Sequence, residues 1–76
     1  MEDVIDLKRR IGRRLQTLRK QHHLSQEVVA KVLGVRAITY CGYEDGKQLI
    51  RTRHCVKLAR FYGVSLDYLL TLSNHR

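Results

Sequence analysis

In residues 26–43, the spacing of the apolar, small and glycine residues is typical of two short helices joined by a tight turn. Apolar and aromatic residues recur at fixed intervals around a small alanine and a glycine: Val29, Ala30, Leu33, Gly34, Val35, Tyr40 and Tyr43. Ala30 allows a second helix to cross closely, and Gly34 permits the tight turn between the two helices. The spacing therefore predicts two short helices joined by a tight turn, over about residues 26–45.

The second of these helices is not what local propensity favours. In "GVRAITYCGYEDG" the residues Ile38, Thr39 and Tyr40 are β-branched or aromatic, which is typical of a strand. Tyr40 and Tyr43 are three residues apart and would share one face of a helix. We therefore expect a short helix over about Arg36–Glu44 that packing holds in place, with Tyr40 and Tyr43 turned inward.

Other helices are marked by apolar stripes and by caps. Residues 4–18 carry an amphipathic stripe, Ser25 and Ser65 are predicted N-caps, and Gly34 and Gly63 are predicted helix ends. The result is an all-α, five-helix fold in a single domain, residues 1–76, with a short tail at 71–76. The expected core comprises Leu15, Leu18, Val29, Leu33, Val35, Tyr43, Leu58, Ala59 and Leu69.

The charge of the chain favours a polyanionic partner. Fifteen Lys and Arg residues stand against seven Asp and Glu, for a net charge of +8 and a pI near 10.1. Nucleic acid is the leading candidate. No apolar run approaches the ~20 residues that a membrane span needs, and the N-terminus lacks the order of a signal peptide. We therefore expect a cytoplasmic protein with no membrane partner.

Neither a metal site nor a catalytic site is expected. Cys41 and Cys55 are predicted to be free thiols, with Cys55 packed inside, because no C-x2-C or H-x3-H pair fixes two metal ligands locally. No nucleophile, base and orienting group recur at a workable spacing, and so small a chain cannot surround them with a pocket. We expect no enzyme activity and no cofactor.

The segments "LSQEVVAKVLGVRAITYCGYEDGK" and "KLARFYGVSLDYLL" together resemble the phage repressor and Cro family of helix-turn-helix regulators, also called the Xre family. The resemblance runs without gaps from about Ile11 to Leu70. It implies the five-helix lambda-repressor-like fold, whose third helix enters the major groove of double-stranded DNA. It also implies a homodimer on a near-palindromic operator.

The resemblance also implies roles for individual residues. A glutamine such as Gln26 holds a phosphate, the start of the third helix reads bases, and the loop "DGKQLIR" touches the DNA backbone again. The expected DNA-binding residues are Gln26, Arg36, Ala37, Ile38, Thr39, Cys41, Gly42, Lys47 and Arg51.

Two hypotheses about function remain open. The first is a sequence-specific DNA-binding transcriptional regulator, acting as a repressor. The second is a protein-interaction module on the same fold, such as an antirepressor or an antitoxin-like partner. Arg36 replaces the usual Ser or Thr cap and alone offers a fork for guanine, while Ala37, Ile38 and Cys41 can meet only thymine methyls. The charge favours the first hypothesis, and this donor-poor face favours the second.

The last helix is crowded with apolar residues: Tyr68, Leu69, Leu70 and Leu72. A core as small as this one is not expected to bury all of them. We therefore expect these four residues to form the contact between the two subunits of a dimer.

Overall fold

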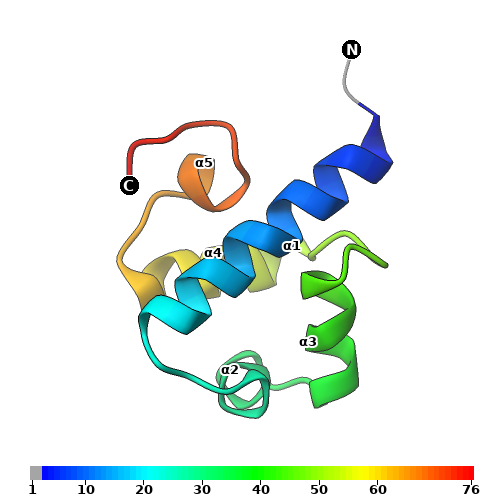
Figure 1. The fold of residues 1–76 in the computed structure, drawn as a ribbon. Coiled ribbons are helices and arrows are strands. Elements are labelled where there is room, and N and C mark those ends of the chain that lie inside the picture. The colour runs from blue at the N-terminus through cyan, green and yellow to red at the C-terminus, as the bar shows by residue number, and fades with distance from the viewer. Residues whose placement is uncertain (1–2) are drawn as a thin grey trace.

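Five helices follow one another along the chain in the computed structural model, which describes residues 3–76 (Figure 1). They are α1 (Val4–Gln21), α2 (Gln26–Leu33), α3 (Ala37–Glu44), α4 (Thr52–Tyr62) and α5 (Leu66–Leu69). Residues 3–76 contain no strand. The prediction of an all-helical fold with five helices is confirmed, although α1 extends three residues further than predicted.

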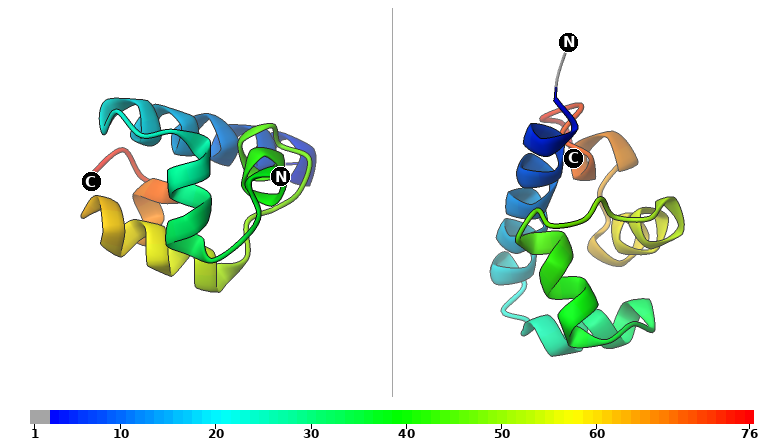
Figure 2. Two further views of the ribbon diagram at one scale, coloured as in Figure 1. Left: turned by 90° about the horizontal axis from the view of Figure 1, so that it is seen from below. Right: turned by 90° about the vertical axis from the view of Figure 1, so that its right-hand side faces the viewer.

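The long helix α1 lies along one side of the molecule (Figure 2). Figure 1 shows α2 and α3 at the bottom and α5 with the C-terminal tail at the top, with α1 crossing between them. The right-hand view of Figure 2 keeps α5 and the tail at the top and α2 and α3 at the bottom, and it shows all four other helices on the same side of α1. Helix α1 packs against both α3 and α5. It buries Ile11, Leu15 and Leu18 and leaves Val4 exposed.

The predicted caps are present. The Ser25 hydroxyl accepts a hydrogen bond from the Val28 amide at 3.2 Å, and the Ser65 hydroxyl accepts one from the Tyr68 amide at 3.0 Å. Gly34 ends α2 in the left-handed conformation, with φ of 72°. Because left-handed backbone suits glycine, Gly34 allows the chain to turn from α2 into α3 within three residues.

The core contains eight of the nine residues predicted for it. Val35 is the exception: it is half-buried and packs against the edge of the core. Tyr40 is fully buried, and the core also takes in Ile11, Ile50, Tyr62 and Tyr68. The aromatic residues of α3 therefore point inward, as their spacing predicts.

The main chains of helices α1 and α3 come into close contact at Gly12. A Cβ atom added to Gly12 would lie 2.7 Å from the carbonyl oxygen of Tyr43, well inside van der Waals contact. Only glycine lets the backbones approach so closely. This contact fixes how deeply α3 sits against α1, and the sequence alone did not predict it.

Candidate nucleic-acid interface

Helix α3 divides its side chains between the core and the surface. Tyr40 and Tyr43 are buried, whereas the Ile38 side chain is 70% exposed. The other outward positions are exposed or partly exposed: Arg36, Ala37, Thr39 and Cys41. The result is a short helix held from beneath, with a largely uncharged outer face and one arginine at its start.

Helices α3 and α4 both begin at an arginine that makes no capping hydrogen bond. These residues are Arg36 and Arg51. Neither helix has an acidic residue in its first turn, whereas α1, α2 and α5 do. First-turn N–H groups that no side chain caps are available to an external anion, and the helix dipole favours that anion.

Basic side chains lie beside the turn into α3 and in the segments on either side of α3. The turn at Gly34 and Val35 lines a shallow hollow of about 360 Å³ together with Arg53 and Lys57 of α4. Both basic residues are exposed, as are Lys31 on α2, Lys47 after α3 and Arg51. The exposed acidic residues nearest to α3 in the sequence are Glu27 before it and Asp45 after it. Positive charge therefore exceeds negative charge around α3.

The pKa of the buried His54 is affected by this positive charge. Its ring is buried, and Nδ1 shares a hydrogen bond with the Tyr43 hydroxyl at 2.8 Å. Burial lowers the pKa of His54, and the neighbouring charges of Arg53, Arg51 and Lys57 lower it further. The imidazole is therefore neutral at neutral pH, and it ties α3 to α4.

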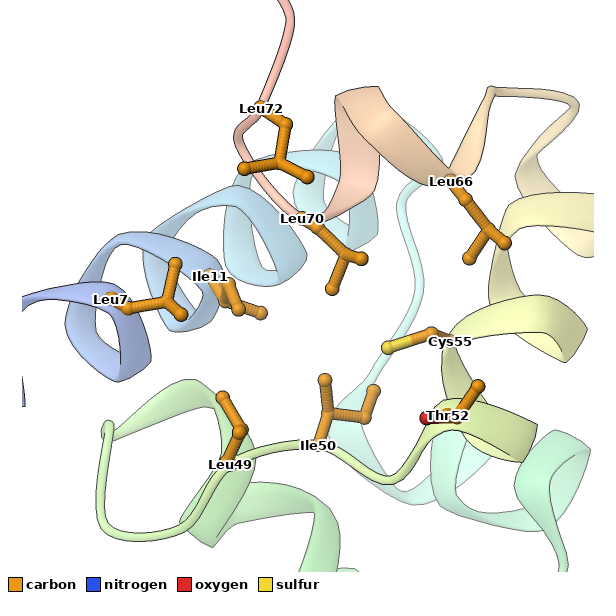
Figure 3. Close-up of a pocket in the computed structure, with 9 residues that line it drawn as sticks. All are labelled: Leu7, Ile11, Leu49, Ile50, Thr52, Cys55, Leu66, Leu70 and Leu72. Atoms are coloured by element: carbon orange, nitrogen blue, oxygen red, sulfur yellow. The ribbon is translucent and has the colours of Figure 1, made fainter. Parts of the chain in front are cut away.

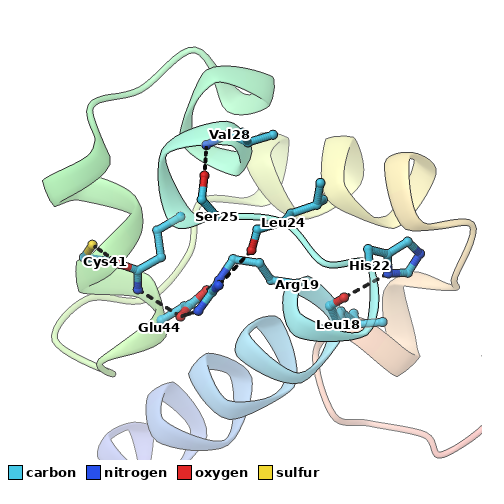
Figure 4. Close-up of polar contacts among 9 residues, drawn as sticks. Leu18, Arg19, His22, Leu24, Ser25, Val28, Cys41 and Glu44 are labelled. Carbon is cyan, nitrogen blue, oxygen red and sulfur yellow. Dashed lines mark hydrogen bonds and ion pairs between the residues drawn. The ribbon is translucent and has the colours of Figure 1, made fainter.

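A polar network fixes the C-terminal end of α3 (Figure 4). Arg19 of α1 donates to both carboxylate oxygens of Glu44, from Nε at 2.7 Å and from Nη2 at 3.1 Å. It also donates to the Leu24 carbonyl at 2.9 Å. Gln26 Nε2 donates to Glu44 at 3.1 Å, and Cys41 Sγ donates to Gln26 Oε1 at 3.0 Å. Three helices thus meet at one buried carboxylate.

Glu44 is ionised despite its burial. Burial raises the pKa of this carboxyl, but the hydrogen bonds from Arg19 and Gln26 and the adjacent Tyr40 hydroxyl outweigh burial, so the pKa is lower than usual. The Tyr40 hydroxyl is buried without a regular hydrogen bond of its own. The bidentate Arg19–Glu44 pair therefore holds α3 against α1 through charge as well as through apolar contact.

A helix-turn-helix family profile matches residues 15–69, which is most of the chain. The chain belongs to this Xre-type family. The match covers α2 to α5 and the second half of α1.

Named relatives in this family include regulators from bacteria and an archaeon. An HTH-type transcriptional regulator of Bacillus subtilis, YobD, is 41% identical over 61 residues, which are 80% of this chain and 54% of that protein. The cryptic phage CTXphi transcriptional repressor RstR of Vibrio cholerae is 40% identical over 58 residues, 76% of this chain and 52% of the repressor. A third regulator, MJ0272 of Methanocaldococcus jannaschii, is 37% identical over 54 residues, 71% of this chain and 82% of that protein. The chain thus spans about half the length of the first two relatives.

Within this helix-turn-helix frame, most of the predicted DNA-binding residues lie at the surface. Arg36, Lys47 and Arg51 are exposed, and Ala37, Ile38, Thr39 and Cys41 are at least partly so. Arg36 precedes α3 as its N-cap rather than lying inside the helix. Their contacts with DNA remain a prediction.

Gly42 does not belong to the exposed face, and its predicted DNA contact is wrong. It is buried beneath Gln48, whose Nε2 would lie 2.8 Å from a Cβ atom at position 42. The same Nε2 donates to the Thr39 carbonyl at 3.3 Å. The glycine therefore makes room for the loop after α3.

Gln26 lies at the first residue of α2, but its side chain is already engaged. Its amide oxygen accepts from Cys41 and its amide nitrogen donates to Glu44, which leaves one side-chain N–H for a phosphate. We retain its phosphate contact as a prediction for that N–H and for the main-chain amide at the start of α2.

Two basic residues beside α3 were not predicted from the sequence, namely Arg53 and Lys57. They come from the first half of α4, and only the packing of α4 beside the α2–α3 turn brings them to this surface. A detectable signal did exist: basic rather than acidic residues at a helix start oppose the helix dipole, and this suggests an external anion.

The expectation for the last helix is partly wrong. Leu69 is fully buried and Tyr68 is 8% exposed, so the core takes in both residues and they are not free for a subunit contact. The core thus buries two of the four residues and not all of them. Leu70 is partly exposed, and Leu72 is 67% exposed.

The cysteines are free thiols, as predicted. Cys55 is buried, and burial raises the pKa of its thiol to about 11, so it packs as a small apolar group. Within residues 3–76, no cluster of three or more His, Cys, Asp or Glu side chains is arranged to hold a metal ion. None of the helices in these residues is long and apolar enough to cross a bilayer.

Proposed function

We propose that this chain is the DNA-binding part of a transcriptional regulator, a repressor that occupies a near-palindromic operator as a homodimer. The observation that carries the proposal is the exposed face of α3, with uncapped helix starts and basic side chains around it. Membership of the helix-turn-helix family and the relatives that are transcriptional regulators or repressors support the same function. In this proposal the chain acts by occupying DNA and uses no catalytic residue or cofactor.

The proposed reading surface is the outer face of α3 in the major groove. Ile38 is 70% exposed and would contact thymine methyl groups, together with Ala37 and Cys41. Arg36 would reach a guanine edge from the start of the helix, since its guanidinium can donate two parallel hydrogen bonds. Thr39 would act as a small polar neighbour.

The proposed positioning contacts lie on either side of α3. The free amides at the starts of α3 and α4 would each receive a phosphate, and Lys47 and Arg51 would add charge to these contacts. Arg53 and Lys57 would make further contacts to phosphates along the DNA backbone. Such contacts fix the position of the protein on DNA without reading its sequence.

The proposed homodimer uses an apolar hollow rather than the buried part of α5. This hollow, of about 260 Å³, opens between α1, the loop before α4 and the C-terminal segment (Figure 3). Its lining is Leu7, Ile11, Leu49, Ile50, Thr52, Cys55, Leu66, Leu70 and Leu72. None of these residues is charged, so two copies of a chain with net charge +8 can approach each other here with the least repulsion.

An electrophoretic titration tests the proposed function. We expect a retarded complex with DNA from upstream of the chain's own gene that survives an excess of random competitor DNA. The affinity should fall steeply with salt, because each neutralised phosphate releases a counterion. Equal affinity for upstream and random DNA would contradict a sequence-specific regulator.

A second candidate function is a protein-interaction module that uses the same α3 face. The observation that favours it is the 70% exposure of Ile38 on a face with few hydrogen-bond donors. A protein partner that binds α3 with little dependence on salt, together with no DNA complex at low salt, would favour this candidate over the first.

A further inference from the structure

A second basic surface lies away from α3, where α1 meets the C-terminal tail. A hollow of about 320 Å³ is lined there by Arg10, Arg13, Arg14, Thr17, Thr71 and Asn74. All six side chains are polar, three are cationic and none is acidic. Figure 1 and the right-hand view of Figure 2 show α5 and the tail at the opposite end of the molecule from α2 and α3, so this hollow is not part of the surface around α3.

The arginines of the hollow share one face of α1. Positions 10, 13, 14 and 17 are spaced three or four residues apart, which places their side chains next to one another. Arg14 is fixed: its Nη1 donates to the Tyr68 carbonyl at 2.7 Å, and its guanidinium carbon lies 3.9 Å from the centre of the Tyr68 ring. Arg13 is exposed. The hollow therefore combines a cation held by Tyr68 with an exposed one.

Thr71, on the opposite wall, has a backbone conformation that threonine rarely adopts. Its φ is 64°, in the left-handed region, where a β-branched side chain is strained. It follows α5 as the residue at which helices commonly place glycine, and its amide donates to the Tyr68 carbonyl at 3.0 Å. Glycine would satisfy the turn without strain, so the turn itself does not explain a threonine.

The Thr71 hydroxyl is also left without a hydrogen bond. Its oxygen is buried and has no partner, which is uncommon in folded proteins and costs free energy. Thr71 as a whole is only half-buried and lines the hollow. Because the hydroxyl has no partner, a bond from it to a ligand in the hollow would break no hydrogen bond of the protein.

We propose that this hollow binds a phosphate group, held by the guanidinium groups of Arg13 and Arg14, with Arg10 adding charge, and by the hydroxyl of Thr71. Three adjacent guanidinium groups suit a dianion, and their planar donors match phosphate oxygens in pairs. The Asn74 amide and the Thr17 hydroxyl supply further donors at the rim. The phosphate comes either from a nucleic-acid backbone or from a free phosphorylated molecule. This site goes beyond the proposed function and does not depend on it.

The charge of the neighbouring surface favours the binding of an anion over that of a cation. A second hollow of about 320 Å³ adjoins the first, shares Arg10 and Arg13, and adds Arg9. Its acidic lining residue is Asp6, which does not line the first hollow. The positive surface therefore continues along α1, and the first hollow is its part without a carboxylate.

Amide NMR with inorganic phosphate as the probe tests the site, at constant pH and ionic strength. We expect saturable shifts of the Arg13, Thr71 and Asn74 amides. Arg13→Gln should weaken phosphate binding about ten-fold, the scale of one hydrogen bond to a charged group. Arg60→Gln removes the same charge from an exposed position on α4 and should change nothing.

Thr71→Val tests whether the Thr71 hydroxyl binds phosphate or only supports the fold, because valine keeps the branched shape and removes the hydroxyl. We expect phosphate binding to weaken about ten-fold, while the unliganded protein is as stable as before or more so. Shifts that do not saturate, or that are the same in wild type, Arg13→Gln and Thr71→Val, would overturn the proposal.

A duplex without an operator distinguishes the two sources of phosphate. If the site holds a nucleic-acid backbone, Arg13→Gln lowers the salt slope of duplex binding by about one unit relative to Arg60→Gln. If it holds a free phosphorylated molecule, the two variants bind the duplex alike and differ only in phosphate binding. Neither result depends on whether α3 reads an operator.

Discussion

Arg36 and Lys47 lie at opposite ends of α3, and we expect them to act differently on DNA. Arg36→Ala should weaken binding to the preferred site by about 1–3 kcal/mol, and binding to random DNA much less, because a base contact is lost. Lys47→Ala should weaken both about equally and lower the salt slope by about one unit. Titrating both variants on specific and random duplexes at several salt concentrations measures these differences.

Lys47→Ala serves as the control for Arg36→Ala, since each removes one exposed positive charge. Equal losses on specific and random DNA for Arg36→Ala would place this residue on a phosphate. Specificity would then come from thymine methyl contacts or from the shape of the DNA.

His54 makes the stability of the fold depend on pH. Its pKa in the folded protein is below the ordinary value of 6.5. Between the folded pKa and 6.5 the unfolded chain binds a proton that the folded protein does not, so stability rises with pH across this window. The contribution is complete above pH 6.5 and is lost as the pH falls through the window to the folded pKa.

Urea denaturation of wild type and His54→Gln between pH 4 and 8 measures this dependence. We expect the free energy of unfolding of wild type to decline below about pH 6.5, the ordinary pKa of histidine, and His54→Gln to lack that part of the decline. His75→Gln, at an exposed position, should behave as wild type. Identical pH profiles for His54→Gln and wild type would refute a buried neutral His54.

The elements α1 and α3 depend on each other through the Arg19–Glu44 pair. Both side chains are largely buried, with 12% and 1% of their surfaces exposed. Arg19→Met should destabilise the protein by about 3–5 kcal/mol, because it leaves the Glu44 carboxylate buried and unpaired. Adding Glu44→Leu to this variant should recover much of the loss.

Chemical denaturation of the two single variants and the double variant gives the coupling energy directly. Lys20→Met, at the next and exposed position of α1, is the matched control and should change stability little. Arg19→Met costing no more than Lys20→Met would mean that the pair does not hold α3.

Local signals in the sequence predict the elements well. Ser25 and Ser65 as caps and Gly34 as a helix end each depend on residues within one turn of a helix, and all three are present. Tyr40 and Tyr43 show packing overriding strand propensity, because their spacing fits a buried helix face. The elements could therefore be predicted one by one.

Contacts between distant residues could not be predicted in this way. Arg19 and Glu44 are 25 residues apart, and no local pattern pairs them. The same holds for Gly12 beneath α3 and for Arg53 beside the α2–α3 turn. The outer face of α3 is exposed, as the predicted site requires, but the sequence did not predict the residues that surround it.

At the scale of the whole molecule, Leu72 should decide whether two copies associate. It lies at the rim of the apolar hollow and is 67% exposed, so Leu72→Glu should leave the fold intact and place a carboxylate in the subunit contact. Sedimentation of wild type at high micromolar concentration should show dimer, and Leu72→Glu should show monomer.

Phe61→Glu is the control for this experiment, because Phe61 is an exposed apolar residue of α4 outside the hollow. It should sediment as wild type does. Wild type that is monomeric both with and without DNA would contradict the homodimer.

The buried and exposed faces of α3 also bear on how the sequence of such a chain evolves. Tyr40, Tyr43 and Glu44 anchor the helix, while Ala37, Ile38 and Cys41 face outward. If α3 reads DNA as proposed, the residues that hold the fold and the residues that choose the target are therefore different. Replacing Ala37 or Ile38 alters what the helix meets and leaves its anchors in place. Under that proposal, we expect a lineage with this arrangement to acquire a new target one outward residue at a time without losing the fold.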